Sequence, residues 1–320
     1  HYPLRRQRQM CIRDRAKQGL DAVMMVSCPS SGYLPFLIGG QNSLQMQLRE
    51  AKRRWHNHRA RWQEDHLVNG ATTITFRAEG HGQSHIAAAM RGLPAGERRR
   101  WWLSLCDTYP TGAYRYRTNQ TDSSDCCMDG CNKRETYDHI TCACPITSDA
   151  ITVAHNKVWR GLYDSIVAAA PHDHVAVFDT PLGQTSLRVS PAIRRLRPDG
   201  VILYPLSRTI CLLEFARTGD ARPEYLDLSR ARKERHYETL QREMATLYPD
   251  YTVRLVPFII GARSFVRETD WQHNWMTLHL PLRTLPRTIQ TTMRRNQEVI
   301  TDILAVRKAA LPRKPKKGDG

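Results

Sequence analysis

Residues 198–216 read PDGVILYPLSRTICLLEFA and contain two apolar runs joined by a short turn. Val201–Tyr204 and Thr209–Phe215 are rich in the branched and aromatic residues that favour strands. Residues 205–208 include proline and serine, which are typical of turns. The pattern therefore predicts a β-hairpin made of these two strands.

This hairpin brings two acids to one edge of a sheet. Asp199 lies at the start of the first strand and Glu214 near the end of the second, and such positions are neighbours in an antiparallel pair. Two carboxylates there form a hard oxygen site suited to Mg²⁺, which polarises a phosphodiester and generates hydroxide from water. Glu214 interrupts an apolar strand, where an acid without a partner is costly to bury. Asp199 alone could instead cap a turn.

Helices and strands alternate around the hairpin. We expect a helix over 147–170, a strand over Val175–Phe178, a helix from Pro223 to about Leu247, and a strand over Thr252–Ile260. Pro257 in the last strand indicates a sheet edge or a bulge. An amphipathic helix follows, with an apolar face that carries Ile289, Met293, Ile300 and Leu304. The order predicts a compact domain of the α/β class, with helices and strands mixed.

A cysteine cluster precedes this domain. Five of the nine cysteines lie within residues 126–144, together with a histidine. The spacing that suits a tetrahedral zinc ion is Cys127-x3-Cys131-x7-His139-x4-Cys144. A closed set of four ligands leaves no position for a substrate, so we expect structural zinc that folds a knuckle over 121–146. Cys126 and Cys142 are spare thiols that could replace a neighbour, and chance clustering is the alternative.

The charge balance points to a polyanionic partner. The chain has 48 Lys+Arg against 31 Asp+Glu, a net charge of +17 and a pI near 9.8. This excess favours nucleic acid over a membrane, whereas a merely basic surface is the alternative. The sequence contains no run of about 18 apolar residues, so it predicts no membrane-spanning helix. No secretory leader is recognisable, so the cysteines favour metal ligation in a reducing compartment over disulfides.

Basic and aromatic residues are interleaved in the expected N-terminal region, which includes an amphipathic basic helix over Gln41–Glu64. Arginines pair with phosphates and aromatic rings stack on bases, although buried aromatics with snorkelling arginines give the same pattern. The candidate nucleic-acid contacts are Arg98, Arg99, Arg100, Arg115, Arg117 and, in a later helix, Arg230.

A cation is expected beside the carboxylates to orient water or to stabilise the leaving charge. Lys233 lies in the helix after the hairpin, with Arg230 and Tyr237 on the same face at i−3 and i+4. From that face a lysine could reach a phosphate next to the metal ion. A solvated surface position is the alternative for Lys233.

These residues resemble the PD-(D/E)xK nuclease superfamily. Pro198-Asp199 and Glu214 match the signature, but Ala216 stands where the lysine is usual. In the restriction-like endonucleases of site-specific non-LTR retrotransposons, that lysine is displaced to the next helix, in a segment that ends Lys-Tyr or similar. Residues 232–237, RKERHY, are similar to this variant.

The same retrotransposon family carries a C-x1–3-C-x7–8-H-x4-C knuckle upstream, which the cysteine cluster fits. Its Arg-His-Asn motif is represented by Ala154-His155-Asn156, without the arginine. The resemblance covers residues 100–265, with the motifs in the family's order. The catalytic residues that it implies are Asp199, Glu214, Lys233, Tyr237 and His155, although a structural role is the alternative for His155.

The resemblance implies the endonuclease portion of a retrotransposon polyprotein, with structural Zn²⁺ and catalytic Mg²⁺. Such a protein acts in the nucleus on DNA and element RNA, and nicks a target strand to prime reverse transcription. The chain has no Tyr-x-Asp-Asp polymerase motif, so the reverse transcriptase domain would lie upstream. Ala216 and the missing arginine favour, as an alternative, a degenerate fold that binds nucleic acid without cutting. A zinc-organised interaction protein is a further alternative.

The N-terminal segment is excluded from this fold. The chain starts at His1 without methionine, which predicts a fragment, and residues 10–15, MCIRDR, resemble a translated sequencing-adapter end. The expected order is a foreign segment over 1–15, a mainly helical basic region over 16–120, the zinc knuckle over 121–146, the endonuclease domain over 147–265, a C-terminal helical extension over 266–312 and a disordered basic tail over 313–320.

Overall fold

The computed structural model describes residues 23–28, 32–37, 83–105, 108–171, 173–222 and 224–310. The chain divides into two compact units, His1–Asp65 and His66–Gly320, which are treated separately. The expectations for the foreign segment, for the helix over Gln41–Glu64 and for the basic tail all concern residues outside the described ranges.

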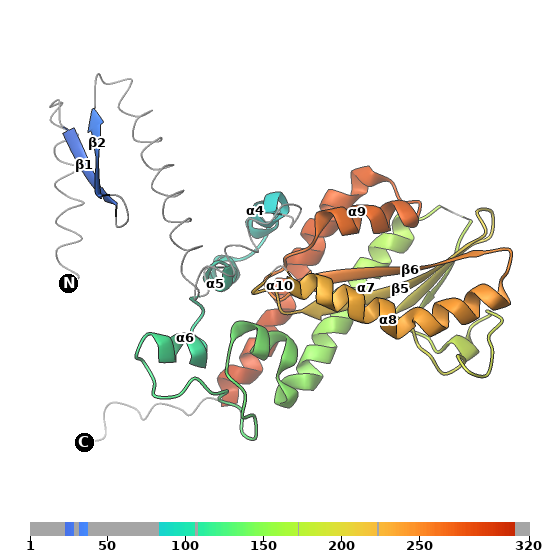
Figure 1. Ribbon diagram of the computed structural model, residues 1–320, viewed down its shortest axis with the longest axis horizontal. Coiled ribbons are helices and arrows are strands. Elements are labelled where there is room, and N and C mark those ends of the chain that lie inside the picture. Colours follow the sequence, from blue (N-terminus) through green and yellow to red (C-terminus); the bar gives the residue numbers. More distant parts are fainter. Residues whose placement is uncertain are drawn as a thin grey trace. The chain divides into compact units, whose positions relative to one another are not determined.

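The first unit contains a β-hairpin. Strand β1 (Val23–Cys28) pairs antiparallel with β2 (Gly32–Leu37) (Figure 1). This hairpin lies within the region 16–120, for which the sequence predicted a mainly helical organisation. Both strands are short runs rich in apolar and aromatic residues, separated by Pro29-Ser30-Ser31, which is a hairpin pattern. Later in the region the second unit is helical, with α4 (Gln83–Arg91), α5 (Ala95–Leu105) and α6 (Gly112–Arg117).

The second unit is built around a mixed four-stranded sheet in the order β3-β4-β5-β6. Strands β3 (Val175–Phe178), β4 (Gly200–Tyr204) and β5 (Thr209–Thr218) are antiparallel neighbours, and the predicted hairpin is confirmed as β4 and β5. Strand β6 (Thr252–Gly261) pairs parallel with β5 and forms an edge, as its proline predicted. The mixed α/β class is therefore confirmed.

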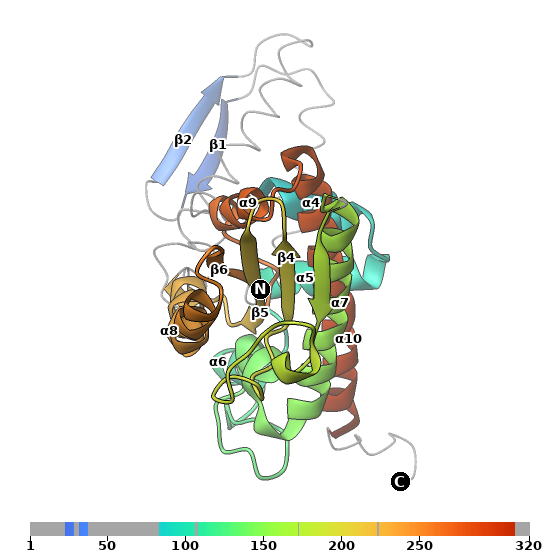
Figure 2. The same cartoon turned by 90° about the vertical axis from the view of Figure 1, so that its right-hand side faces the viewer.

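Helices cover both faces of this sheet (Figure 2). Helices α7 (Ser148–Ala169) and α10 (Leu285–Ala310) pack on one face, and α8 (Glu224–Leu247) packs on the other. Side chains of β5 alternate between the two layers, since Leu213 joins the core under α7 and α10 and Leu212 joins the core under α8. Coverage on both faces explains why β5 is apolar almost throughout.

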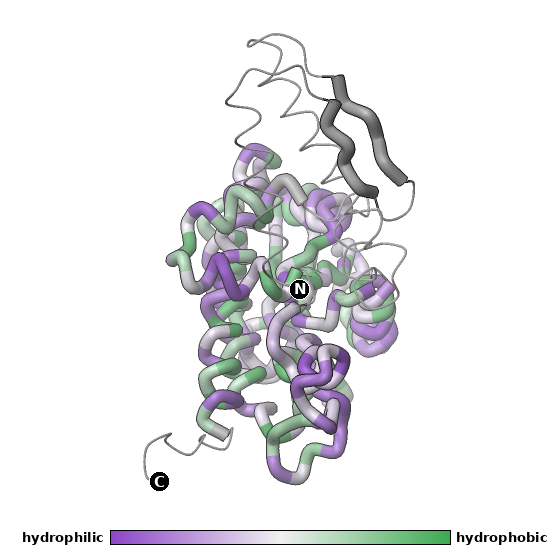
Figure 3. The backbone as a smooth tube through the Cα atoms, turned by 90° about the vertical axis from the view of Figure 1, so that its left-hand side faces the viewer, coloured by the Kyte–Doolittle hydropathy of each residue, from purple (hydrophilic) through white to green (hydrophobic). Residues whose placement is uncertain are grey.

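The C-terminal helices complete the core. Helix α9 (Glu268–Thr277) packs beside β6, and α10 lies along α7, with Ile289 and Met293 fully buried. Hydrophilic and hydrophobic residues alternate along α10, the helix that leads to the C-terminus (Figure 3). The predicted extension is thus an integral layer of the second unit. None of the helices in the described ranges is long and apolar enough to cross a membrane.

Buried charges join the end of the sheet to the cysteine-rich segment. Arg263, just after β6, forms ion pairs with Asp220, at 2.9 Å, and with Asp138. Its Nε donates to the Ser104 carbonyl at 2.8 Å. Asp220 also accepts a hydrogen bond from the Arg263 backbone N–H at 2.7 Å. Because Arg263 and Asp220 are fully enclosed, removing either partner would leave an uncompensated charge.

Glycine at position 261 makes room for this network. A Cβ atom there would lie 2.0 Å from Asp220 Oδ2, whereas a Cβ at Gly96 in α5 would meet nothing within 4 Å. We expect Gly261→Ala to destabilise the protein by about 1–3 kcal/mol through overpacking. Gly96→Ala should stabilise it by about 0.5–1 kcal/mol, since alanine favours helix. Thermal unfolding of both variants checks this, and equal effects would contradict it.

Candidate active site and metal centre

The structure brings Asp199 and Glu214 together where β4 begins. Glu214 Oε1 accepts a hydrogen bond from the Asp199 backbone N–H at 3.3 Å. In return, Asp199 Oδ2 accepts one from the backbone N–H of Phe215 at 2.7 Å. Each acid is therefore held by the strand that carries the other, which fixes the two carboxyl groups at the same place on the sheet.

The backbone of Asp199 is fixed from the opposite layer. Its carbonyl accepts hydrogen bonds from Trp159 Nε1 in α7, at 2.8 Å, and from the backbone N–H of Asp179, at 3.1 Å. Gly200 follows with so little space that an added Cβ would lie 2.9 Å from the Tyr163 ring. Helix α7 thus positions the first acid without touching its carboxylate.

Helix α8 supplies a cation to the pair. Lys233 Nζ lies 2.7 Å from Glu214 Oε2, and the side chains are 23% and 1% exposed, respectively. Tyr237 lies one helical turn later, on the same face of the helix, and lowers the pKa of Glu214. Ala216 is buried and offers no charge. The ammonium group beside the carboxylates therefore comes from the helix and not from β5.

The environment of Glu214 favours its protonated form. Burial raises the pKa of Glu214 to about 7, the nearby charge of Asp199 adds to the rise, and Lys233 and Tyr237 oppose it. Burial, followed by the charge of Glu214, likewise raises the pKa of Tyr237. When both carboxyl groups are ionised, one lysine leaves a net negative charge in a poorly hydrated place, which a divalent cation would neutralise.

His155 lies beside this site but contacts the strand backbone. Its Nε2 donates to the Phe215 carbonyl at 3.2 Å, and its ring lies 5.1 Å from the Phe215 ring, centroid to centroid. The neighbouring Asn156 side chain lies 3.2 Å from its Nδ1. These contacts favour the structural alternative, in which His155 positions the residue that follows Glu214.

Several predicted nucleic-acid contacts are occupied within the protein. Arg230 pairs with Asp270 at 2.6 Å and with Glu234 at 3.1 Å. Arg100 donates to Thr301 Oγ1 at 2.6 Å. The other predicted arginines differ in their surroundings: Arg98 and Arg99 are exposed, Arg115 is half-buried, and Arg117 lies over the Tyr114 ring at 5.4 Å.

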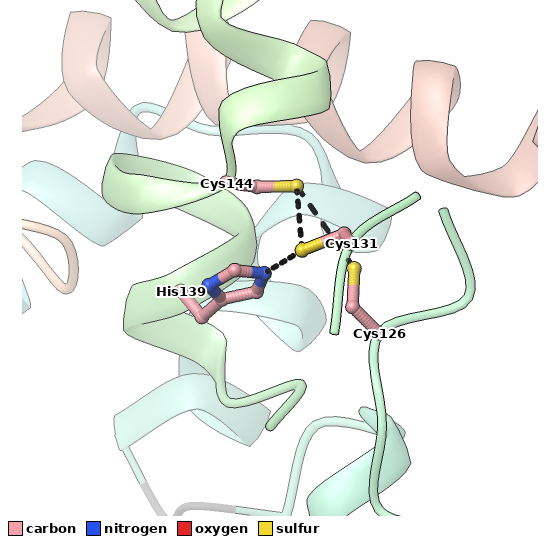
Figure 4. A group of neighbouring side chains, drawn as sticks. All are labelled: Cys126, Cys131, His139 and Cys144. Carbon is pink, nitrogen blue, oxygen red and sulfur yellow. Dashed lines mark hydrogen bonds between the residues drawn. The ribbon is translucent and has the colours of Figure 1, made fainter. Parts of the chain in front are cut away.

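Three cysteines and a histidine converge in front of α7 (Figure 4). The group consists of Cys126, Cys131, His139 and Cys144, with all ligand atoms within 4.8 Å of one another. The two sulfur–sulfur distances to Cys144 are 3.9 Å, and Cys131 Sγ lies 3.3 Å from His139 Nε2. Zinc–sulfur bonds of about 2.3 Å in a tetrahedron imply sulfur–sulfur edges of about 3.8 Å. The cluster is compatible with a zinc ion.

The structure corrects the predicted ligand set by one residue, because Cys126 and not Cys127 joins the group. Asp125 and Arg134 form a short antiparallel pairing, and the Cys126 N–H donates to the Lys133 carbonyl at 2.8 Å. Successive residues of such a pair face opposite ways. Cys126 therefore faces the other ligands, whereas the backbone N–H of Cys127 donates to Glu135 at 3.1 Å. Cys142 is outside the group.

A buried ion pair supports this segment from the far end of the chain. Glu135 accepts a hydrogen bond from the Gly112 backbone N–H at 2.5 Å and pairs with Arg307 of α10. Burial alone would raise the pKa of Glu135, but the hydrogen bond and charge of Arg307 outweigh it, so the pKa is lowered. Sequence reasoning missed this pair, since 172 residues separate its members and no local pattern connects them.

No family model matches the chain, and no curated protein matches it in sequence.

The choice of the first cysteine ligand can be tested directly. We expect Cys126→Ser and His139→Ala to lose bound zinc, since each removes a ligand atom, and to lower the melting temperature of the second unit. Cys127→Ser should keep about one zinc per chain. Metal analysis of the purified variants, with thermal unfolding, measures both effects. Retention of zinc by Cys126→Ser, or its loss from Cys127→Ser, would reinstate the ligand set expected from spacing.

The raised pKa of Glu214 predicts a pH-dependent stability. Its pKa is about 7 in the folded protein against 4.5 ordinarily, so the folded state binds more protons between these values. The stability contributed by protonated Glu214 is lost as pH rises through this window. Without added divalent cations, we expect Glu214→Gln to match the wild type near pH 5 and to melt at a higher temperature at pH 8. A constant difference across this range would be evidence against the burial described here.

Proposed function

We propose that the second unit is a metal-dependent DNA endonuclease with a PD-(D/E)xK-like core. The observation that carries the proposal is the Lys233 ammonium, 2.7 Å from Glu214, whose carboxylate also accepts a hydrogen bond from the Asp199 backbone. In the motif resemblance, the lysine missing at Ala216 is displaced to the next helix. The contact between Lys233 and Glu214 supports that reading, and it favours an active site over a degenerate one.

The order of elements supports the same proposal. Helix α7, strands β3, β4 and β5, helix α8 and strand β6 follow one another, and the two acids lie on the central antiparallel pair. Helices cover both faces of the sheet. The site lies at the level of the sheet where β4 begins. This is the arrangement that the resemblance implies.

The carboxylates of Asp199 and Glu214 fit a Mg²⁺ ion. Both supply oxygen ligands, and Glu214 is buried with excess negative charge around it. Two protein ligands leave most of an octahedral shell to water and phosphate oxygens, as is usual for magnesium bound with a phosphate substrate. A bound ion of this kind supplies Lewis acidity toward the phosphate and lowers the pKa of a coordinated water.

The residues of the chain would position the reaction. Lys233 holds Glu214 Oε2 and is placed to stabilise the charge that builds on the phosphate oxygens. Tyr237, on the same helix face as Lys233, favours the ionised form of that carboxylate. Trp159 and His155 hold the backbone on either side of the acids. The Cys3His cluster would bind structural zinc, because its four ligands leave no open position.

In its biological setting, this activity would nick a target DNA strand so that the free 3′-hydroxyl primes reverse transcription. The protein would then be part of a retrotransposon polyprotein that acts in the nucleus, with element RNA and an upstream reverse transcriptase domain as partners. The net charge of +17 suits a nucleic-acid partner.

Nicking of supercoiled plasmid DNA tests the proposal. We expect Asp199→Asn and Glu214→Gln to abolish Mg²⁺-dependent nicking while DNA binding persists. Lys233→Met should lower the rate constant about 100-fold or more, as for loss of a group that stabilises the transition state. Arg242→Met is the matched control, because Arg242 lies on the same helix in an exposed ion pair with Glu238.

The control variant should cut like the wild type. Undiminished nicking by both acid variants would disprove the proposal. DNA binding by a wild-type protein that never nicks with Mg²⁺ or Mn²⁺ would support the degenerate alternative.

A further inference from the structure

The segment between β3 and β4 carries four arginines immediately before the catalytic aspartate. The side chains of Arg188, Arg194, Arg195 and Arg197 are all exposed. Arg197 pairs with Asp179 at 2.7 Å. Within the described ranges, the other three have no carboxylate at ion-pair distance. Unpaired arginines this close to Asp199 are available to an external anion.

The backbone that carries these arginines is anchored. Leu182 and Ile193 are buried in the core beneath α8. The two ends of the segment also pair, since Gly183 N–H donates to the Arg194 carbonyl at 2.8 Å and Leu182 N–H donates to the Leu196 carbonyl at 2.9 Å. The arginine side chains therefore project from a fixed backbone, which reduces the ordering cost of binding.

One flank of α8 faces this segment. Ser190 Oγ donates to Glu243 Oε2 at 3.0 Å, which identifies the flank. Residues three or four positions apart lie above one another on a helix. Arg232 and His236 therefore share the flank with Glu243, at eleven and seven residues before it, respectively. Both are exposed.

The opposite flank of α8 is occupied within the protein. Arg230 pairs with Asp270 of α9, and Gln241 Nε2 donates to the Val253 carbonyl of β6. Arg230 had been expected to bind nucleic acid, but it belongs to this internal flank. The free positive charge of α8 near the site is thus on the side of the arginine segment.

The carboxylates lie between these two basic elements. Arg195 is four residues before Asp199, so their Cα atoms are at most about 14 Å apart. Arg232 is the neighbour of Lys233, which contacts Glu214. Asp179, just before the segment, pairs with Arg197, and Glu243 on the facing flank of α8 accepts from Ser190. Positive charge on both sides of a phosphodiester-cutting site suits the backbone phosphates next to the scissile one.

We propose that the segment Leu182–Arg197 and the Arg232–His236 flank of α8 form the surface that binds the phosphate backbone of duplex DNA, with Arg194 and Arg195 as its main contacts. The proposal rests on the proposed function for the identity of the ligand. It assigns DNA contact to residues other than those that the interleaved sequence clusters indicated.

The test uses the full chain with zinc bound and compares two double variants of equal charge. Arg194→Ala/Arg195→Ala alters the proposed surface. Arg283→Ala/Arg287→Ala is the control, because both residues are exposed and lie around the start of α10. That region follows Leu278, whose carbonyl accepts from Tyr204 at the end of β4 opposite to Asp199.

Binding of a fluorescein-labelled DNA duplex is measured by anisotropy over a series of salt concentrations, with Ca²⁺ in place of Mg²⁺. Loss of two phosphate contacts should reduce the slope of log K against log salt by about 1.8 and weaken binding at least about tenfold at 0.1 M salt. The control should stay within about twofold of the wild type.

Equal losses in both variants, no loss in the first, or no salt-dependent binding by the wild type would overturn the proposal. The readout does not require cleavage. A selective loss of binding in a protein that never nicks would keep the surface and refute the endonuclease. Normal nicking with unchanged DNA binding in Arg194→Ala/Arg195→Ala would refute the proposed surface and keep the endonuclease.

Discussion

A carboxylate buried in the middle of a covered sheet is the constraint around which this site is organised. Glu214 lies in β5, which has strands on both sides and helices on both faces. A charge there is tolerated only with partners. Lys233 and Tyr237 come from α8, and the Asp199 backbone comes from β4. The arrangement that satisfies Glu214 therefore also assembles a cation, a phenol and a second acid at one point.

A second buried set of charges joins the cysteine-rich segment to this domain. Asp138 precedes His139 of the Cys3His cluster and pairs with Arg263, which also pairs with Asp220 after β5. Glu135 makes a similar link to Arg307 of α10. The Cys3His cluster, held in this way, is part of the same compact unit as the sheet. Structural metal would accordingly support the whole unit and not a small separate knuckle.

The arginines illustrate how folding redistributes positive charge. Interleaving with aromatic residues made Arg100 a candidate for nucleic-acid contact, and its place on the face of Lys233 made Arg230 one, yet both are bound within the protein. Trp101, their aromatic counterpart, is buried and donates to the Arg263 carbonyl at 2.8 Å. Free arginines instead lie before Asp199, in a segment whose sequence shows no aromatic interleaving. Proximity to the carboxylates, and not local composition, marks them.

The sequence by itself determined the helices and strands that a local spacing of apolar residues predicts. The β4–β5 hairpin, the edge position of β6 and the long helices α7, α8 and α10 follow from apolar runs, turns and spacing. The meeting of Asp199 with Glu214 also follows, since a tight hairpin fixes its own register.

Only the tertiary structure decided the rest. A short antiparallel pairing turns the side chain of Cys126, and not that of Cys127, toward the Cys3His cluster. Packing of α8 on the sheet brings Lys233 into contact with Glu214, and packing of α10 forms the Glu135–Arg307 ion pair. These depend on how distant elements pack, which no local pattern encodes.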